Sequence, residues 1–149
     1  MLPIHSRFNA RLGAALVAFA LVGCAGHSGV VPSDQWPAQL ESALPTDVLL
    51  LGEQHDAPDH QRLQRDTVQW LAARGRLAAV VLEMAERGHS TAALARDATE
   101  APVQSALQWN DAAWPWSAYG PVTMAAVRAR APVLGGTPPR SAMAAATPE

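Results

Sequence analysis

Short apolar runs alternate with helical patterns along most of the chain. Residues 48–51 (VLLL), 78–82 (AAVVL) and 132–134 (PVL) lack polar positions, the last run being the weakest. Strands that are apolar on both faces belong in parallel sheets covered by helices. We therefore expect three parallel strands at these positions.

The segment between the first two runs, residues 58–74, has its apolar residues at helical spacing. Pro58 suits a first helical turn, and Gly75 suits the end of a helix. Further helices are expected at about 90–97, 102–109 and 117–130. This alternation predicts an α/β domain in which helices cover a parallel-sheet core.

The first 23 residues follow a different pattern. A start with two arginines and no acid precedes an apolar run, residues 12–23, that is too short to span a bilayer. Together they are typical of a secretory signal peptide over residues 1–23. We expect this segment to be removed.

The end of that segment, Leu-Val-Gly-Cys at 21–24, resembles the lipobox of bacterial lipoproteins. In that pattern Cys24 becomes the mature N-terminus and carries acyl chains, which form a stable membrane tether. The next residue, Ala25, resembles outer-membrane sorting, so we expect a cell-envelope protein on the outer membrane facing the periplasm. A lipid-anchored tether is expected over 24–40 and the α/β domain over 41–149.

The composition narrows the function further. Cys24 is the single cysteine, which excludes an internal disulfide framework. The formal net charge is −2, there is no lysine, and no arginine-rich run is interleaved with aromatic residues. Nucleic acid is therefore not an expected partner.

The densest group of polar residues follows the first apolar run. Glu53 and His55 could face the same side of the loop, where a carboxylate and an imidazole can bind a metal, hold a water or pair with each other. Asp56 lies near the start of the next helix and could cap it. His60 lies one turn into that helix. It is either a ligand that converges with the loop residues or a solvated helix residue.

The loops after the other two runs also carry unusual residues. Glu83 and Met84 follow the second run, and Gly135, Gly136 and Arg140 follow the third. Ligands of open α/β sheets bind at the carboxyl ends of the strands, so residues distant in sequence would meet there. We expect Glu83 either to be exposed at this edge or to be held by a partner such as His55.

A second constellation is aromatic. Trp109, Trp114, Trp116 and Tyr119 lie within eleven residues, although the whole chain has only eight aromatic residues. Such a cluster either fills core or forms a flat apolar ligand surface. Tyr119 is the only tyrosine, and its oxygen is a hard donor that suits ferric iron.

Four ordered blocks together resemble the ChaN-like haem-binding lipoproteins, which are related in fold to erythromycin esterases and TraB/Tiki-type proteins. The blocks are LGEQHD at 51–56 with His60, LEM at 82–84, the aromatic segment 109–121 and GGTPPR at 135–140. Members of that family are longer, so the resemblance implies the N-terminal part of the fold and a chain truncated at its C-terminus.

The resemblance implies a haem-binding protein for iron acquisition rather than an enzyme. It implies a homodimer that encloses haem, with Tyr119 as the iron ligand and a histidine hydrogen-bonded to it, His55 first and His60 second. Arg140 is a candidate for a haem propionate by its charge. Glu53 and Glu83 complete the expected haem-binding residues.

Two other functions remain open from the sequence. A metal-assisted hydrolase, as the esterase relatives suggest, would use Glu53, His55 and Glu83 to hold a metal or activate water. A non-catalytic envelope lipoprotein would use its tryptophan-rich segment for protein contacts alone.

Overall fold

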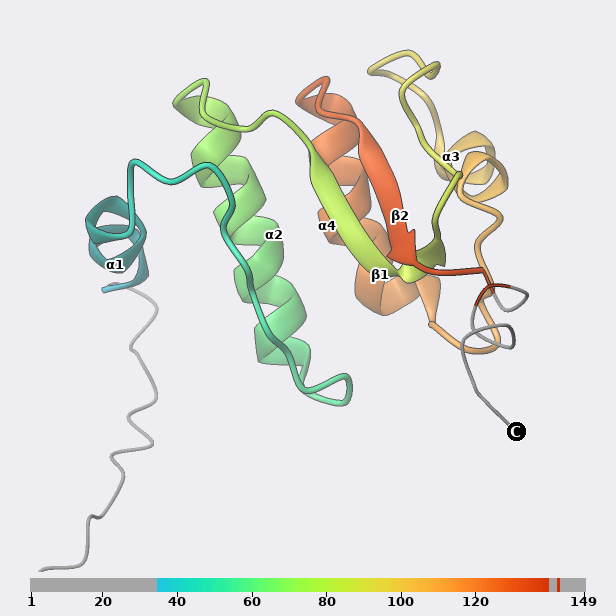
Figure 1. Cartoon of the computed structure of the whole chain (residues 1–149), viewed down its shortest axis with the longest axis horizontal. Helices are drawn as coiled ribbons and strands as arrows, with labels where there is room; N and C mark the ends of the chain where they lie inside the picture. Colours follow the sequence, from blue (N-terminus) through green and yellow to red (C-terminus); the bar gives the residue numbers. More distant parts are fainter. Residues whose placement is uncertain (1–34, 140–141, 143–149) are drawn as a thin grey trace, which may run out of the picture. The chain divides into compact units, whose positions relative to one another are not determined.

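The computed structural model describes residues 35–139 and residue 142, which form a small mixed α/β domain (Figure 1). Two parallel strands lie among four helices, which confirms the predicted α/β class. In chain order the elements are α1 (Trp36–Ser42), α2 (Pro58–Ala73), β1 (Val80–Glu86), α3 (Glu100–Ala106), α4 (Trp116–Arg128) and β2 (Val133–Thr137).

The sheet pairs β1 with β2 in parallel, with Val80 opposite Val133 and Leu82 opposite Gly135. The chain that follows β1 returns along the other edge of β2, where the Thr91 N–H donates to the Val133 carbonyl (3.0 Å). The Gly135 N–H donates to the His89 carbonyl (3.1 Å) beside it. Among the described residues, the second edge of β1 therefore has no partner strand.

Gly135 marks a close approach between the two strands. The register shifts between Leu82 and Glu86, and a Cβ at Gly135 would overlap the Glu86 carbonyl group. A Cβ at Gly136 would lie 3.0 Å from Cγ1 of Val81. The predicted loop glycines thus lie within β2, where they allow the strands to pack.

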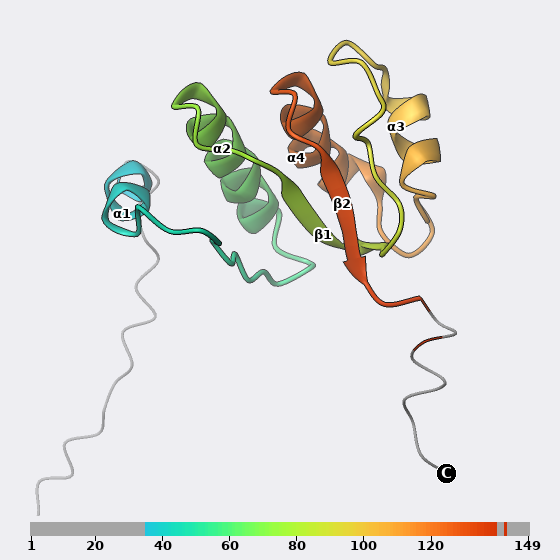
Figure 2. The ribbon, with the colours of Figure 1, turned by 45° about the horizontal axis from the view of Figure 1, so that its top comes forward.

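The helices α2 and α4 lie side by side, and α4 packs against β2 (Figures 1 and 2). Their facing side chains form the core with residues of both strands and of the segment around α3. The larger residues of this core are Val68, Leu82, Val103, Leu107, Trp116, Val122, Met124, Val127 and Val133. This packing holds the N-terminal turn of α4 in place, and that turn carries Tyr119, a residue of the candidate site.

The predicted boundaries of α2 are correct. The helix begins at Pro58, and Gly75 follows its end with a φ of +64°. The predicted cap is wrong, however, because the N-cap residue is Ala57 and makes no side-chain cap hydrogen bond. Asp56 lies one residue too early to accept from the first turn.

The predicted strand at 48–51 is also wrong. This segment has no strand partner among the described residues, and Val48 and Leu50 are 69% and 87% exposed. The apolar run satisfies the sequence pattern of a buried strand, but a strand also needs a neighbouring edge. The predicted sheet of three strands is therefore a sheet of two.

The helix predicted over 90–97 is replaced by turns: the Thr91 N–H donates to the Val133 carbonyl of β2, and the Leu94 N–H donates to the Thr91 carbonyl three residues before it. The helix expected at 102–109 is α3, which begins and ends slightly earlier. The helix expected at 117–130 is α4.

The tether was expected over 24–40, and its last residues, from Trp36 onward, are helical in the structure because they belong to α1. Pro37 lies in the first turn of α1, where proline is tolerated, and Leu40 is buried. The indole Nε1 of Trp36 donates to Oγ1 of Thr67 (2.7 Å), which joins α1 to α2. The predicted signal peptide, Cys24 and Arg140 lie outside the described residues.

Candidate functional site

A phenol, a carboxylate and an imidazole meet where the loop before α2 reaches the first turn of α4. The Tyr119 hydroxyl donates to Oε1 of Glu53 (2.7 Å), and Nδ1 of His55 lies 2.7 Å from the same oxygen. The Tyr119 oxygen and the His55 Nδ1 are 3.4 Å apart. We call these three residues the phenol cluster. It confirms that Glu53 and His55 face the same side, and it adds Tyr119 as their shared partner.

Two residues of α2 hold the loop in this position. The Gln54 N–H donates to Nδ1 of His60 (3.0 Å), and the side-chain amide of Gln61 donates to the His55 carbonyl (3.0 Å). His60 was expected as a second ligand, and in the structure its imidazole supports the loop backbone. Gln61 was not predicted. Its signal was a polar residue seven positions before Val68 on the buried face of the helix.

The three groups of the phenol cluster differ in their access to solvent. Tyr119 is 1% exposed and the Glu53 side chain 5%, whereas the His55 side chain is 48% exposed. Burial raises the pKa of Tyr119 to about 12, and the hydrogen bond and the charge of Glu53 act in the same direction. The phenol is therefore neutral at physiological pH, and solvent reaches the cluster past His55.

One atom of the phenol cluster has no partner. Oε2 of Glu53 is buried and makes no hydrogen bond among the described residues. Leaving a buried carboxylate oxygen unpaired is unfavourable, because its hydration is lost without replacement. Such an atom marks a place where a ligand would be stabilised.

Aromatic rings surround the phenol. The ring of Trp114 meets His55 edge-on at 4.9 Å and Tyr119 at 5.9 Å between centroids. Trp109 lies 6.0 Å from Tyr119, and its Nε1 donates to the Trp114 carbonyl (2.8 Å). Trp116 is buried, and its indole occupies the space a Cβ at Gly120 would need. Both interpretations of the aromatic segment therefore hold in part: Trp116 fills core, while Trp109 and Trp114 are half-buried beside the phenol cluster.

The other predicted site residues lie apart from this cluster. Glu83 and Met84 lie within β1 rather than after it, and the Glu83 side chain is exposed. The Glu83 carbonyl accepts from the Thr137 hydroxyl, which ties β1 to β2. Among the described residues, no three His, Cys, Asp or Glu side chains are grouped so as to hold a metal ion.

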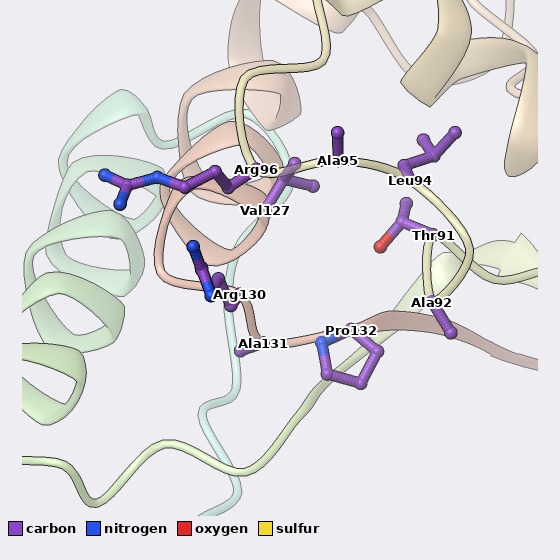
Figure 3. A pocket seen from close by; sticks show the side chains of 9 residues that line it. All are labelled: Thr91, Ala92, Leu94, Ala95, Arg96, Val127, Arg130, Ala131 and Pro132. Carbon is purple, nitrogen blue, oxygen red and sulfur yellow. The ribbon is translucent and has the colours of Figure 1, made fainter.

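A hollow of the described surface lies elsewhere, between the loop after β1 and the C-terminal end of α4 (Figure 3). It has a volume of about 430 Å³ and an apolar lining with Arg96 and Arg130 at its rim. None of the carboxylate, imidazole or phenol groups described above lines it. The phenol cluster and this hollow are thus separate features of the described residues.

Comparison with known proteins agrees with the motifs. A family model described as haem-binding uptake, Tiki superfamily, ChaN, matches residues 39–149. No curated protein and no solved structure matches the chain. None of the helices in the described part of the chain is long and apolar enough to cross a membrane.

Proposed function

Because the chain belongs to the haem-binding uptake family of the Tiki superfamily that includes ChaN, we propose that it is an envelope lipoprotein that binds haem for iron acquisition. The observation that carries this proposal is the phenol cluster beside half-buried indole rings. A hard oxygen donor next to flat apolar side chains suits a ferric porphyrin better than a small polar substrate.

The donor set fits haem in its chemistry. Bound haem would supply a ferric centre, and Tyr119 would hold it through its oxygen, a hard donor. Glu53 holds the phenol proton at Oε1, and His55 lies within 3.4 Å of the phenol oxygen. Glu53 would orient the phenol and accept its proton, and His55 would help to orient the phenol before haem enters. Trp114, in contact with both His55 and Tyr119, would face the porphyrin.

Haem binding through Tyr119 requires that its buried hydroxyl become accessible. Tyr119 is 1% exposed, so its oxygen becomes available only after His55 and Trp114 change position. His55 is the most exposed group of the phenol cluster, and its Nδ1 lies 3.4 Å from the phenol oxygen. We infer that displacement of His55 accompanies haem binding.

A hemin titration of the full chain in detergent tests haem binding. Wild type is expected to shift the hemin absorbance spectrum, and Tyr119→Phe to abolish the shift, because phenylalanine lacks the donor oxygen. His89→Gln is the control, since His89 lies outside the phenol cluster. Absence of a shift in a wild-type chain shown to be folded by circular dichroism would overturn the proposal.

The lipid anchor at Cys24, the outer-membrane location and a haem-enclosing homodimer belong to the same proposal. They are supported by the Leu-Val-Gly-Cys motif and by the exposed apolar residues Val48, Leu50 and Val81. Labelling with radioactive palmitate is expected to mark wild type and not Cys24→Ser. Sedimentation with and without hemin would show whether two chains assemble around the ligand.

A further inference from the structure

Two arginine side chains line one side of the hollow between the loop after β1 and the end of α4. Arg96 comes from that loop and Arg130 follows the last turn of α4, and Figure 3 shows both on the side away from Leu94. Neither arginine forms an ion pair within the part of the chain that the structure describes. Among the described lining residues, none is acidic. Two positive charges therefore border the hollow without a balancing negative group.

The backbone of Arg130 has a conformation that usually belongs to glycine. Its φ is +61°, at the position just after Ala129, the C-cap of α4. Glycine is the usual residue there, because a Cβ is unfavourable in the left-handed region. The arginine side chain is thus present at a conformational cost, and such costs are concentrated at binding sites. This is a sign, independent of charge, that the guanidinium group has a use.

The end of α4 does not need this guanidinium group as a cap. Basic side chains near a helix C-terminus often donate to the last carbonyl groups. Here the backbone N–H groups of residues 129–131 bind them instead, and that of Arg130 donates to the Val127 carbonyl (2.9 Å). Among the described residues, the hydrogen bonds of arginine side chains come from Arg65 and Arg74. The guanidinium group of Arg130 is therefore available to a ligand.

The rest of the lining is mainly apolar and is fixed to the fold. Leu94, Val127 and Pro132 contribute apolar side chains to it. Thr91 ties the loop wall to β2, because its N–H donates to the Val133 carbonyl (3.0 Å) and its Oγ1 accepts from the Val133 N–H (2.9 Å). The volume of about 430 Å³ lies within the range of small-molecule sites, about 300–1,000 Å³. The hollow thus combines apolar room with a positively charged side.

We propose that this hollow binds a small organic acid, a carboxylate with an apolar body. Guanidinium groups pair with carboxylates through charge-assisted hydrogen bonds, and apolar side chains remove the hydrocarbon from water. A carboxylate carries one charge, so it loses less hydration in an apolar hollow than a phosphate ester, which carries nearly two. The whole chain has a formal net charge of −2, so any attraction for an anion is local to Arg96 and Arg130.

Calorimetric titration with octanoate tests the site in the full chain in detergent, after subtraction of a titration into detergent alone. Wild type is expected to bind one octanoate per chain. Hexanoate should bind on the order of tenfold more weakly, because it buries two methylene groups fewer. Octanol lacks the charge and octyl phosphate has too much of it, so each should bind more weakly than octanoate.

Two variants remove the charges without removing the fold. Arg130→Gly suits a φ of +61°, so it should weaken octanoate binding at least tenfold while the thermal midpoint measured by circular dichroism stays the same or rises. Arg96→Gln should weaken binding to a similar extent. Arg128→Gln is the matched control, because Arg128 is an exposed arginine at the end of α4 that does not line the hollow.

The inference is overturned if folded wild type shows no saturable binding, or if Arg130→Gly and Arg96→Gln bind octanoate like wild type. Tighter binding of octanol or octyl phosphate than of octanoate would overturn it as well. A parallel hemin titration keeps it distinct from the proposed function. Both arginine variants should keep the wild-type hemin response, because Tyr119 does not line the hollow, and a hemin shift lost in both would make the hollow part of the haem site. Octanoate binding without any hemin shift in wild type would overturn the proposed function alone.

Discussion

Tyr119 illustrates how the surroundings of one side chain set its chemistry. Its oxygen is enclosed by Trp114 and Trp109 and held by Glu53, so its proton is retained far more strongly than in water. A ligand that requires the phenolate must therefore compensate for removing this proton. This requirement favours ferric centres over weakly polarising cations.

The same effect links the stability of the fold to pH. The pKa of Tyr119 is about 12 in the folded chain and about 10 in the unfolded chain, so unfolding above pH 10 releases a proton. This contribution is fully present below pH 10 and is lost as the pH rises through 12. We expect the free energy of unfolding to fall by about 1–3 kcal/mol across this interval.

Urea unfolding at a series of pH values would measure this loss, and Tyr119→Phe should lack it. Ultraviolet absorbance of the tyrosinate reports the phenol directly, since the chain has a single tyrosine. A titration midpoint near 10 in the folded protein would contradict the burial and hydrogen bonding described above.

For single residues, the sequence predicted which side chains belong to the site better than it predicted which of them contact one another. The grouping of Glu53 with His55 followed from their spacing on one loop, and Tyr119 was the only phenol available. Glu83 was expected either to be exposed at the sheet edge or to be held by a partner such as His55. It is exposed, and Tyr119 meets both loop residues. Which residue completes such a group depends on how α4 packs against α2, and local spacing does not contain that information.

Among the elements, β2 depends most on a single small residue. Gly135 lies where β1 changes register, and its missing side chain leaves room for the Glu86 carbonyl. The two consecutive glycines are therefore explained by strand packing. They need no role in ligand binding.

Gly135→Ala should destabilise the fold, because the added methyl group overlaps backbone atoms that cannot rotate away. Overpacking of this kind costs roughly 1–3 kcal/mol and occasionally more. Gly52→Ala is a matched control, since a Cβ there would meet nothing within 4 Å. Urea unfolding followed by circular dichroism should separate the two variants, and equal stabilities would contradict the close approach.

Elements with strong local signals were predicted correctly, and those that depend on tertiary partners were not. The helix α2 begins at Pro58 and ends just before Gly75 as expected, because both residues act through their own backbone geometry. The run at 48–51 needed an adjacent strand edge, and the segment 90–97 is tied to β2 at Thr91 and forms turns in place of a helix. In both cases the deciding partner is distant in sequence.

At the scale of the whole domain, the described chain leaves apolar side chains and one strand edge uncovered. Val48, Leu50 and Val81 are 69%, 87% and 63% exposed, and β1 has a strand partner on one edge among the described residues. Small sheets with open edges are marginal and prone to pair with other chains.

Self-association is therefore expected to increase with protein concentration. The double variant Leu50→Lys and Val81→Lys should reduce it while leaving the free energy of unfolding within about 0.5 kcal/mol, because both side chains are already exposed. Gln69→Lys adds one positive charge to the exposed face of α2 and serves as the control for the single variants Leu50→Lys and Val81→Lys. Sedimentation velocity would measure the effect, and association that persists in the double variant would place the contact elsewhere.

The hydrogen bond from Trp36 to Thr67 has a consequence for the reach of a membrane-bound form. Eleven residue steps separate Cys24 from Gln35, the first described position, and even a fully stretched chain of that length spans only about 40 Å. Because the indole fastens α1 to α2, this helix does not unwind to extend that span without losing the bond. If Cys24 carries acyl chains as proposed, Gln35 lies within that distance of the bilayer, and α1 adds no length to the tether while this bond is kept.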